Sequence, residues 1–134
     1  MKVVLFACVH NAGRSQMAAA LFNRLADPAR ARAISAGTRP GDCVHPEVVE
    51  VMRELGVDLS GARPQTLTDQ LARGVHLLIT LGCDEACPNV QGLQRDDWLL
   101  DDPKGQPIAR VREIRADIEG RVTELVRAEG WGRN

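Results

Sequence analysis

Two segments of this chain are almost continuously apolar, and each ends at polar or glycine residues. They span residues 2–7 and 75–80, and such runs are typical of strands in a parallel sheet that is covered on both faces. Residues 32–36, closed by Gly37, predict a second and weaker strand. Residues 98–100, Trp-Leu-Leu, predict a short fourth strand.

Apolar residues at helical spacing lie between the first three strands and after the fourth. In the first interval Met17, Leu21 and Leu25 recur every fourth residue, which predicts one face of an amphipathic helix. Proline favours a helix start and glycine a helix end. The predicted helices span residues 16–25, 46–55, 66–73 and 107–129.

Strands that alternate with helices predict right-handed crossovers and therefore a parallel sheet. The expected fold is α/β, with three layers and a four-stranded parallel sheet in the middle. A chain of 134 residues is large enough for one core and too small for two. We therefore expect residues 1–134 to form a single domain.

A loop with the sequence Cys-Val-His-Asn-Ala-Gly-Arg-Ser, residues 8–15, joins the first strand to the first helix. Backbone N–H groups in such a loop can surround a tetrahedral oxyanion, and the helix N-terminus adds positive potential. Arg14 offers a planar fork to two oxygens. Cys8 would act as a thiolate nucleophile below the anion, and Ser15 would hydrogen-bond to it. We call residues 8–15 the anion loop; its predicted substrate-binding residues are Val9, His10, Asn11, Ala12, Gly13 and Arg14.

Other reactive side chains follow later strands of the predicted sheet. Cys83 comes after the third strand, and Asp102 comes after the fourth. The carboxyl ends of parallel strands lie at one edge, where such sheets bind ligands. We therefore expect Cys83 and Asp102 at the same edge as Cys8.

Charge and cysteine content narrow the function classes. A net charge of −1 provides no general attraction to nucleic acid or to anionic lipid. No stretch has the length of a membrane span, and the first apolar run is too short for a signal peptide. The sequence therefore predicts a cytoplasmic protein.

Four cysteines in a reducing compartment do not predict structural disulfides. Cys83 and Cys87 have the spacing of zinc ligands, but no further pair completes a set of four. We therefore expect no metal and no cofactor. Redox chemistry remains as the use for several cysteines.

The anion loop resembles that of the low-molecular-weight protein tyrosine phosphatases and of the arsenate reductases built on the same scaffold. Further landmarks occur in the order of that family, and several favour the reductases. They are Gln16-Met17-Ala18, Ser35-Ala36-Gly37, Thr80-Leu81-Gly82-Cys83 with Cys87-Pro88, and Trp98-Leu99-Leu100-Asp101-Asp102-Pro103.

The resemblance implies a general acid in an Asp-Pro step, which here is Asp102-Pro103. Asp101 is adjacent, and in an extended segment it would point to the opposite side. Asp102 is therefore favoured over Asp101. Some relatives bind potassium through a glutamate four residues after the serine; Ala19 stands there in this chain, so we expect no such site.

The resemblance also implies a thiol relay. Thioredoxin-linked reductases carry two cysteines in the region of Cys83 and Cys87, but further apart, and the first follows the Thr-Leu step directly. Here Gly82 takes that place. The shifted pair resembles a branch among actinobacterial reductases, some of which use mycothiol with a glutaredoxin-like partner. Cys43 has no basic neighbour and is expected to be a bystander, and His10 is expected to project away from the anion.

The resemblance predicts reduction of arsenate to arsenite, with phosphate and sulfate as analogues and thioredoxin or another small thiol or redoxin as reductant. An arsenate–mycothiol transferase with an external thiol remains an alternative. A tyrosine phosphatase is another, although the sequence has no tyrosine and places Lys104 after the Asp-Pro step. A third alternative is a non-catalytic sensor of metalloids or of redox state, which would use the cysteines and need no general acid.

Overall fold

The computed structural model describes residues 1–81 and 93–133 of the chain. The strands are β1 (Lys2–Cys8), β2 (Ala31–Gly37), β3 (Leu77–Thr80) and β4 (Gln94–Asp97). The helices are α1 (Arg14–Leu25), α2 (Pro46–Arg53), α3 (Asp69–Arg73) and α4 (Ile108–Glu129). Helices separate β1 from β2 and β2 from β3, as the hydrophobic pattern predicts.

All four strands are parallel and lie in the order β2-β1-β3-β4. Their carboxyl ends are in register, because Cys8 pairs with Gly37, Ala7 with Thr80, and Thr80 with Asp97. The segments that follow β1, β3 and β4 therefore leave the sheet at one edge.

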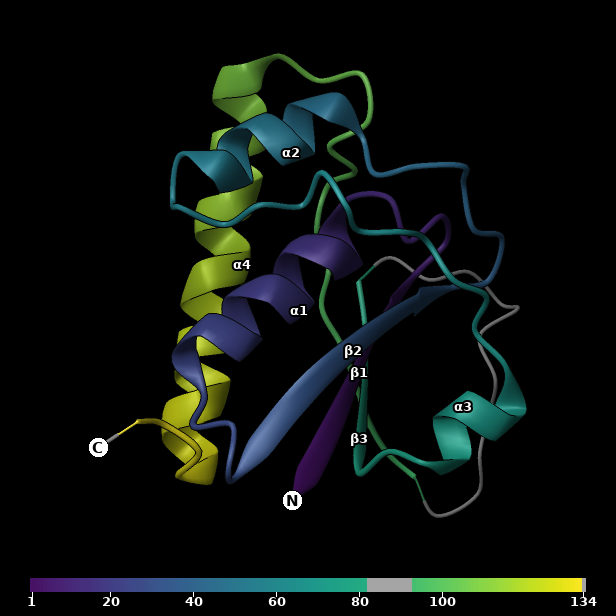
Figure 1. The fold of residues 1–134 in the computed structure, drawn as a ribbon, viewed down its shortest axis with the longest axis vertical. Helices are drawn as coiled ribbons and strands as arrows, with labels where there is room; N and C mark the ends of the chain where they lie inside the picture. The colour runs from purple at the N-terminus through teal and green to yellow at the C-terminus, as the bar shows by residue number, and fades with distance from the viewer. Residues whose placement is uncertain (82–92, 134) are drawn as a thin grey trace.

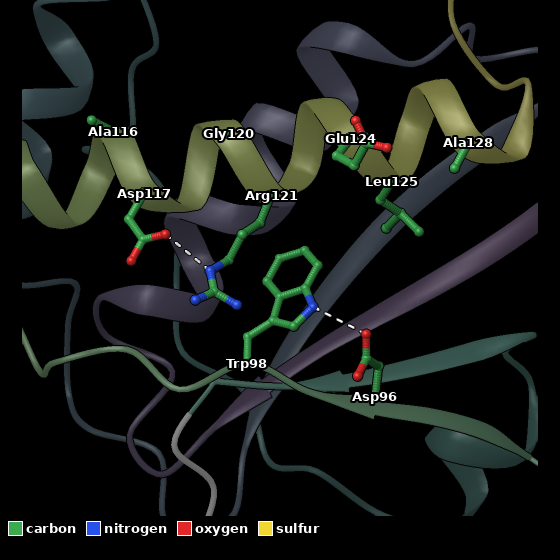
Figure 2. A pocket seen from close by; sticks show the side chains of 9 residues that line it. All are labelled: Asp96, Trp98, Ala116, Asp117, Gly120, Arg121, Glu124, Leu125 and Ala128. Carbon is green, nitrogen blue, oxygen red and sulfur yellow. Dashed lines mark hydrogen bonds and ion pairs between the residues drawn. The ribbon is translucent and has the colours of Figure 1, made fainter.

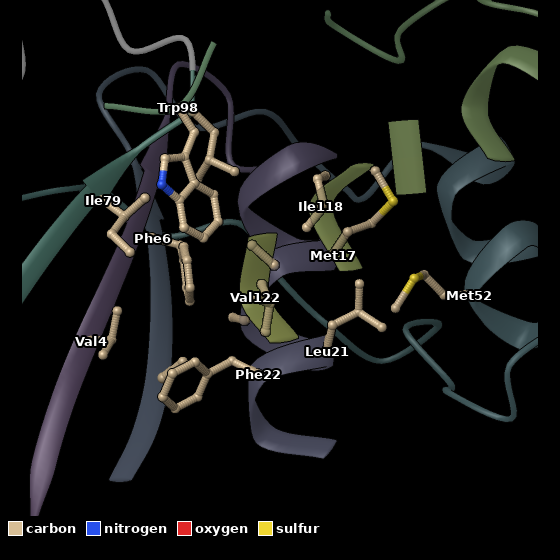
Figure 3. Packing of buried hydrophobic residues seen from close by; sticks show 14 of the residues in the cluster. Val4, Phe6, Met17, Leu21, Phe22, Met52, Ile79, Trp98, Ile118 and Val122 are labelled. Carbon is tan, nitrogen blue, oxygen red and sulfur yellow. The ribbon is translucent and has the colours of Figure 1, made fainter. Parts of the chain in front are cut away.

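Helices cover both faces of the sheet, and Figure 1 shows α1, α2 and α4 on one face with α3 on the other. On the first face, side chains such as Val4, Phe6 and Ile79 pack against α1 and α4, as Figure 3 shows. The intervening residues Leu5 and Leu78 point to the opposite face, toward α3. The predicted three-layer α/β fold with a four-stranded parallel sheet is confirmed.

The fourth strand is the one element that the pattern misplaces. The predicted strand at residues 98–100 is wrong, and β4 lies just before it. β4 is an edge strand whose four side chains are all exposed, so it carries no apolar signal. Trp98 packs against Phe6 with ring centroids 5.7 Å apart, whereas Leu99 is 86% exposed.

Helix boundaries differ from the predicted ones by a few residues. α1 begins at Arg14, two residues earlier than expected, and α2 ends at Arg53. α3 begins at Asp69 because the Thr68 side chain accepts a hydrogen bond from the N–H of Leu71 and caps the helix. Among the described residues, no helix has both the length and the apolar character that a membrane crossing requires.

Candidate active site

The anion loop connects the buried end of β1 to the start of α1. Cys8 is only 3% exposed, and Arg14 is the first residue of α1. A second stretch, residues 38–45 and here called the outer segment, holds the loop from outside. Its N–H groups at Thr38, Arg39, Gly41 and His45 donate to the carbonyls of Cys8, Val9, His10 and Ala12, at 3.2, 2.8, 2.9 and 2.9 Å.

These bonds use carbonyl oxygens of the loop and leave its donors free. Within the described part of the chain, the N–H groups of residues 9–13 donate to no other protein group. Donors of this kind beside a helix N-terminus favour an anion. The local geometry is therefore that of an oxyanion cradle.

Gly37 allows the loop to approach strand β2 closely. A Cβ atom at this position would lie 2.6 Å from the carbonyl oxygen of Val9 and 2.9 Å from the backbone nitrogen of Asn11. Backbone atoms cannot move aside as a flexible side chain can. Any larger residue at position 37 would therefore displace the anion loop.

The Cys8 thiol forms a hydrogen bond with Ser15. Cys8 Sγ and Ser15 Oγ are 2.8 Å apart, and both are buried. Asn11 Nδ2 donates to the same Oγ at 2.7 Å, so that oxygen already accepts one hydrogen bond. A hydroxyl carries one hydrogen. The Ser15 hydrogen can therefore point at Cys8 Sγ, and a bond donated in that direction would stabilise negative charge on the sulfur.

Asn11 is the residue whose role the sequence analysis missed. It has a φ of 51°, in the left-handed region that asparagine tolerates better than most residues. Its Oδ1 accepts from the N–H of Gln65 at 3.0 Å and from Gln16 Nε2 at 3.2 Å. Two donors on Oδ1 fix the amide so that Nδ2 faces Ser15. In the sequence, the residue type at position 11 was the one available signal for this role of Asn11.

Arg14 reaches from the anion loop to the segment after β4. Its Nη1 donates to the carbonyl oxygen of Leu100 at 3.0 Å, and its Nη2 lies 3.8 Å from Asp102 Oδ2. The Arg14 side chain is 11% exposed and that of Asp102 is 47% exposed. Asp102 therefore lies beside the loop while keeping access to solvent protons.

Asp101 and Asp102 point to different partners. Asp102 Oδ1 accepts the N–H of Lys104 at 3.0 Å. The Asp101 carboxylate instead forms an ion pair with Arg110, near the start of α4. Only Asp102 of the two lies next to Arg14.

The other candidate side chains are placed as follows. Nδ1 of His10 hydrogen-bonds with the carbonyl oxygen of Arg39 at 3.0 Å, so the ring lies against the outer segment. Cys43 is exposed on that same segment. Cys83 and Cys87 lie outside the described residues, so their expected proximity to Cys8 stays a prediction.

A polar contact joins β3 and β4 at the edge that carries the loop. The Thr80 hydroxyl donates to the Asp97 carboxylate. This bond, with a second one from Arg95, holds the pKa of Asp97 below its usual value. The contact links the strand that leads to the Cys83 segment with the strand that leads to Asp102.

Away from the anion loop, a hollow lies between β4 and α4. It has a volume of about 490 Å³, and Figure 2 shows two polar contacts between residues that line it. Arg121 contacts Asp117 at 2.9 Å, and Trp98 Nε1 donates to Asp96 at 3.2 Å. Trp98 is only 7% exposed, so this hollow offers little aromatic surface to a ligand. Among the described residues, no group of three His, Cys, Asp or Glu side chains could hold a metal ion.

Comparison with known proteins places this geometry in a family. The family of low molecular weight phosphotyrosine protein phosphatases matches residues 3–130. The chain belongs to this family. A Halobacterium salinarum protein is 43% identical over 126 residues, which is 90% of this chain and 87% of that protein.

Two relatives have informative names. The glutaredoxin arsenate reductase of Synechocystis is 33% identical over 129 residues, 94% of this chain and 97% of that protein. The thioredoxin-dependent arsenate reductase of Corynebacterium glutamicum has a solved structure with a TM-score of 0.82 and 41% identity. The match covers 96% of this chain but spans only 61% of the Corynebacterium chain.

Proposed function

We propose that this protein reduces arsenate to arsenite in the cytoplasm, in a pathway of arsenic detoxification. The observation that carries the proposal is the 2.8 Å hydrogen bond between Cys8 Sγ and Ser15 Oγ. It lies beneath a loop whose N–H groups have no acceptor among the described residues, with Arg14 beside it. Relatives named arsenate reductase support the choice of substrate. Arsenate has the tetrahedral shape and charge of phosphate and sulfate, so the same cradle suits all three.

The first chemical step joins sulfur to arsenic. The Cys8 thiolate attacks arsenic(V) and forms an S–As bond, while one As–OH bond breaks. Asp102 donates a proton to the departing hydroxide, which leaves as water. Arg14 and the loop N–H groups hold the remaining oxygens and their negative charge.

The second step transfers the electrons. A second thiolate attacks Cys8 Sγ, a disulfide forms, and the S–As bond breaks with its electron pair left on arsenic. Arsenic(V) becomes arsenic(III), which leaves as arsenite. In the internal relay this thiolate is Cys83, and Cys87 then attacks Cys83 to release Cys8. Thioredoxin, oxidised in turn, reduces the Cys83–Cys87 disulfide.

An external thiol is the alternative to that relay. A mycothiol-type or glutaredoxin-type thiol would attack the Cys8 adduct directly. The names of the relatives include both a thioredoxin-dependent and a glutaredoxin reductase, so they do not decide between the internal relay and an external thiol. Cys83→Ser and Cys87→Ser distinguish the two routes. The internal relay predicts loss of multiple turnover with thioredoxin in both variants, and a trapped Cys8–Cys83 disulfide in Cys87→Ser.

A tyrosine phosphatase would use the same Cys8, Arg14 and Asp102. Phosphotyrosine recognition needs aromatic side chains around the loop. The chain has four aromatic residues, all of them described. Phe6, Phe22 and Trp98 are buried, and Trp131 packs against Phe22. None lines the anion loop, which supports a small inorganic oxyanion as substrate.

The test is turnover of arsenate by the purified protein with thioredoxin, thioredoxin reductase and NADPH, run beside mycothiol with its own oxidoreductase. We expect NADPH oxidation that depends on arsenate and arsenite as product. Cys8→Ser is the matched control. Absence of arsenite with every reductant, together with rapid hydrolysis of phosphotyrosine, would favour the phosphatase. Binding of arsenite or oxidant without any turnover would favour a sensor.

A further inference from the structure

The acid loop, residues 99–104, alternates between exposed and anchored residues. Leu99, Asp101, Asp102 and Lys104 are exposed, whereas Leu100 packs against the core and Pro103 is buried. Gly105, directly after it, has a φ of +72°. The direction of Asp102 therefore depends on a small number of specific anchors.

Two of these anchors fix the acid loop to the anion loop. The first is the hydrogen bond from Arg14 to the carbonyl oxygen of Leu100. The second is Pro103, which is buried against Gly13; a Cβ atom on that glycine would come within 2.8 Å of Pro103 Cγ. Both anchors flank Asp102, but neither determines which of the two adjacent carboxylates faces Arg14.

The third anchor involves Asp101. Its carboxylate pairs with Arg110 on α4, and Arg110 Nη1 also contacts Glu113 at 3.0 Å. Glu113 is one helical turn further along α4, so it helps to orient the guanidinium toward the loop. The neighbouring Asp102 points to a different partner, with its Oδ2 3.8 Å from Arg14 Nη2. Holding Asp101 against α4 therefore turns Asp102 toward Arg14.

The pairing also has an electrostatic consequence. The substrate is an anion, and an unpaired Asp101 would place a second negative charge near it. Arg110 neutralises that charge on the far side of the loop. The two carboxylates thus acquire separate tasks, although they are neighbours in the sequence.

We propose that Asp101 and Arg110 form a positioning pair that orients Asp102 as the general acid. The inference rests on the proposed function in one respect, since it assumes that Asp102 donates the proton. Neither residue of the pair touches the substrate. Their contribution is to hold the acid within reach of the leaving oxygen, and an exposed ion pair is expected to affect the rate by about three- to fivefold.

A double-mutant cycle tests the pair. Asp101→Asn and Arg110→Gln should each lower kcat about three- to fivefold, and the double variant should lose no more than the worse single one. Arg110→Lys should retain most of the rate. The inhibition constant of sulfate should stay unchanged, because the anion loop is intact. Arg121→Gln, which breaks the Arg121–Asp117 contact on the same helix, is the matched control and should have wild-type kcat.

A measurement without turnover separates this inference from the proposed function. The Lys104 N–H donates to Asp102 Oδ1, so its hydrogen exchange reports whether Asp102 is held. Exchange should accelerate about three- to fivefold in Arg110→Gln and not in Arg121→Gln. If the wild-type protein reduces no arsenate but this exchange result holds, the proposed function fails and the positioning pair stands. Unchanged exchange, additive losses in kcat, or weaker sulfate binding in Arg110→Gln would overturn the pair.

Discussion

Deleting the Ser15 hydroxyl removes the one side-chain hydrogen-bond partner of the Cys8 thiol among the described residues. In Ser15→Ala, Cys8 Sγ loses its partner at 2.8 Å and Asn11 Nδ2 loses its acceptor. A hydrogen bond to a charged group contributes about 1.5–3 kcal/mol. Loss of that bond should therefore weaken the stabilisation of negative charge on Cys8 Sγ by a factor of roughly 10 to 150, at about 1.4 kcal/mol for each factor of ten.

The rate of alkylation reports this change, but only in part. A sulfur that has lost a hydrogen bond is also the stronger nucleophile, and with a Brønsted coefficient of about 0.5 roughly half of the logarithmic loss remains. Alkylation of Cys8 by iodoacetamide at neutral pH should consequently slow by about 3- to 12-fold. Mass spectrometry of the peptide that contains Cys8 separates this reaction from alkylation of Cys43 and of the other cysteines.

Ser35→Ala is the control for that experiment, because it deletes the same hydroxyl from β2, opposite Phe6 in the sheet. Its Cys8 alkylation rate should equal that of the wild type. Equal rates for wild type and Ser15→Ala would show that Ser15 does not donate to the thiolate. The inferred direction of the hydrogen bond, from the Ser15 hydroxyl to Cys8 Sγ, would then be wrong.

Three further predictions concern the acid, the loop and an ion pair distant from both. Asp102→Asn should lower the rate of the chemical step by roughly two to four orders of magnitude, which is the usual contribution of a positioned acid. Asp101→Asn should lower that rate only several-fold. Stopped-flow rates in the reverse order would assign the acid to Asp101. Gly37→Ala should destabilise the protein by about 1–3 kcal/mol and weaken its stabilisation by sulfate, because the new Cβ meets Val9 and Asn11; an unchanged melting temperature with and without sulfate would contradict this. Arg112 and Arg115 lower the pKa of Glu54 from 4.5 to about 2. A depressed folded-state pKa gives stability that is present above pH 4.5 and lost as pH falls toward 2. Glu54→Gln should therefore melt below wild type at pH 6 and converge with it near pH 2; a difference that grows with acidity would refute the assignment.

The sequence predicts the sheet and the anion loop well because their signals are local. A buried strand is continuously apolar, and the Cys-x5-Arg-Ser spacing is confined to eight residues between a strand and a helix. Register then follows from parallel pairing, which places Thr80 and Asp97 at the edge that Cys8 occupies. Membership of the phosphatase family follows from the same residues in the same order.

Features that depend on long-range contacts were not visible in the sequence. β4 is polar because it lies at the sheet edge, so hydropathy assigned the strand to the apolar residues that follow it. The orientation of Asn11 depends on Gln65, which is 54 residues away. The different orientations of Asp101 and Asp102 depend on Arg110, which pairs with Asp101 from helix α4. In each case a tertiary contact, rather than a local preference, decides the outcome.

Arsenite produced in a single turnover tests the central claim most directly. The reduced wild-type protein is mixed with excess arsenate and no external thiol, and both arsenite and protein disulfide are quantified. With the internal relay, the account predicts one arsenite per protein, one new disulfide, and no arsenite from Cys8→Ser. Arsenite formation that persists in Cys8→Ser would contradict it, because the electrons would then reach arsenic without passing through Cys8.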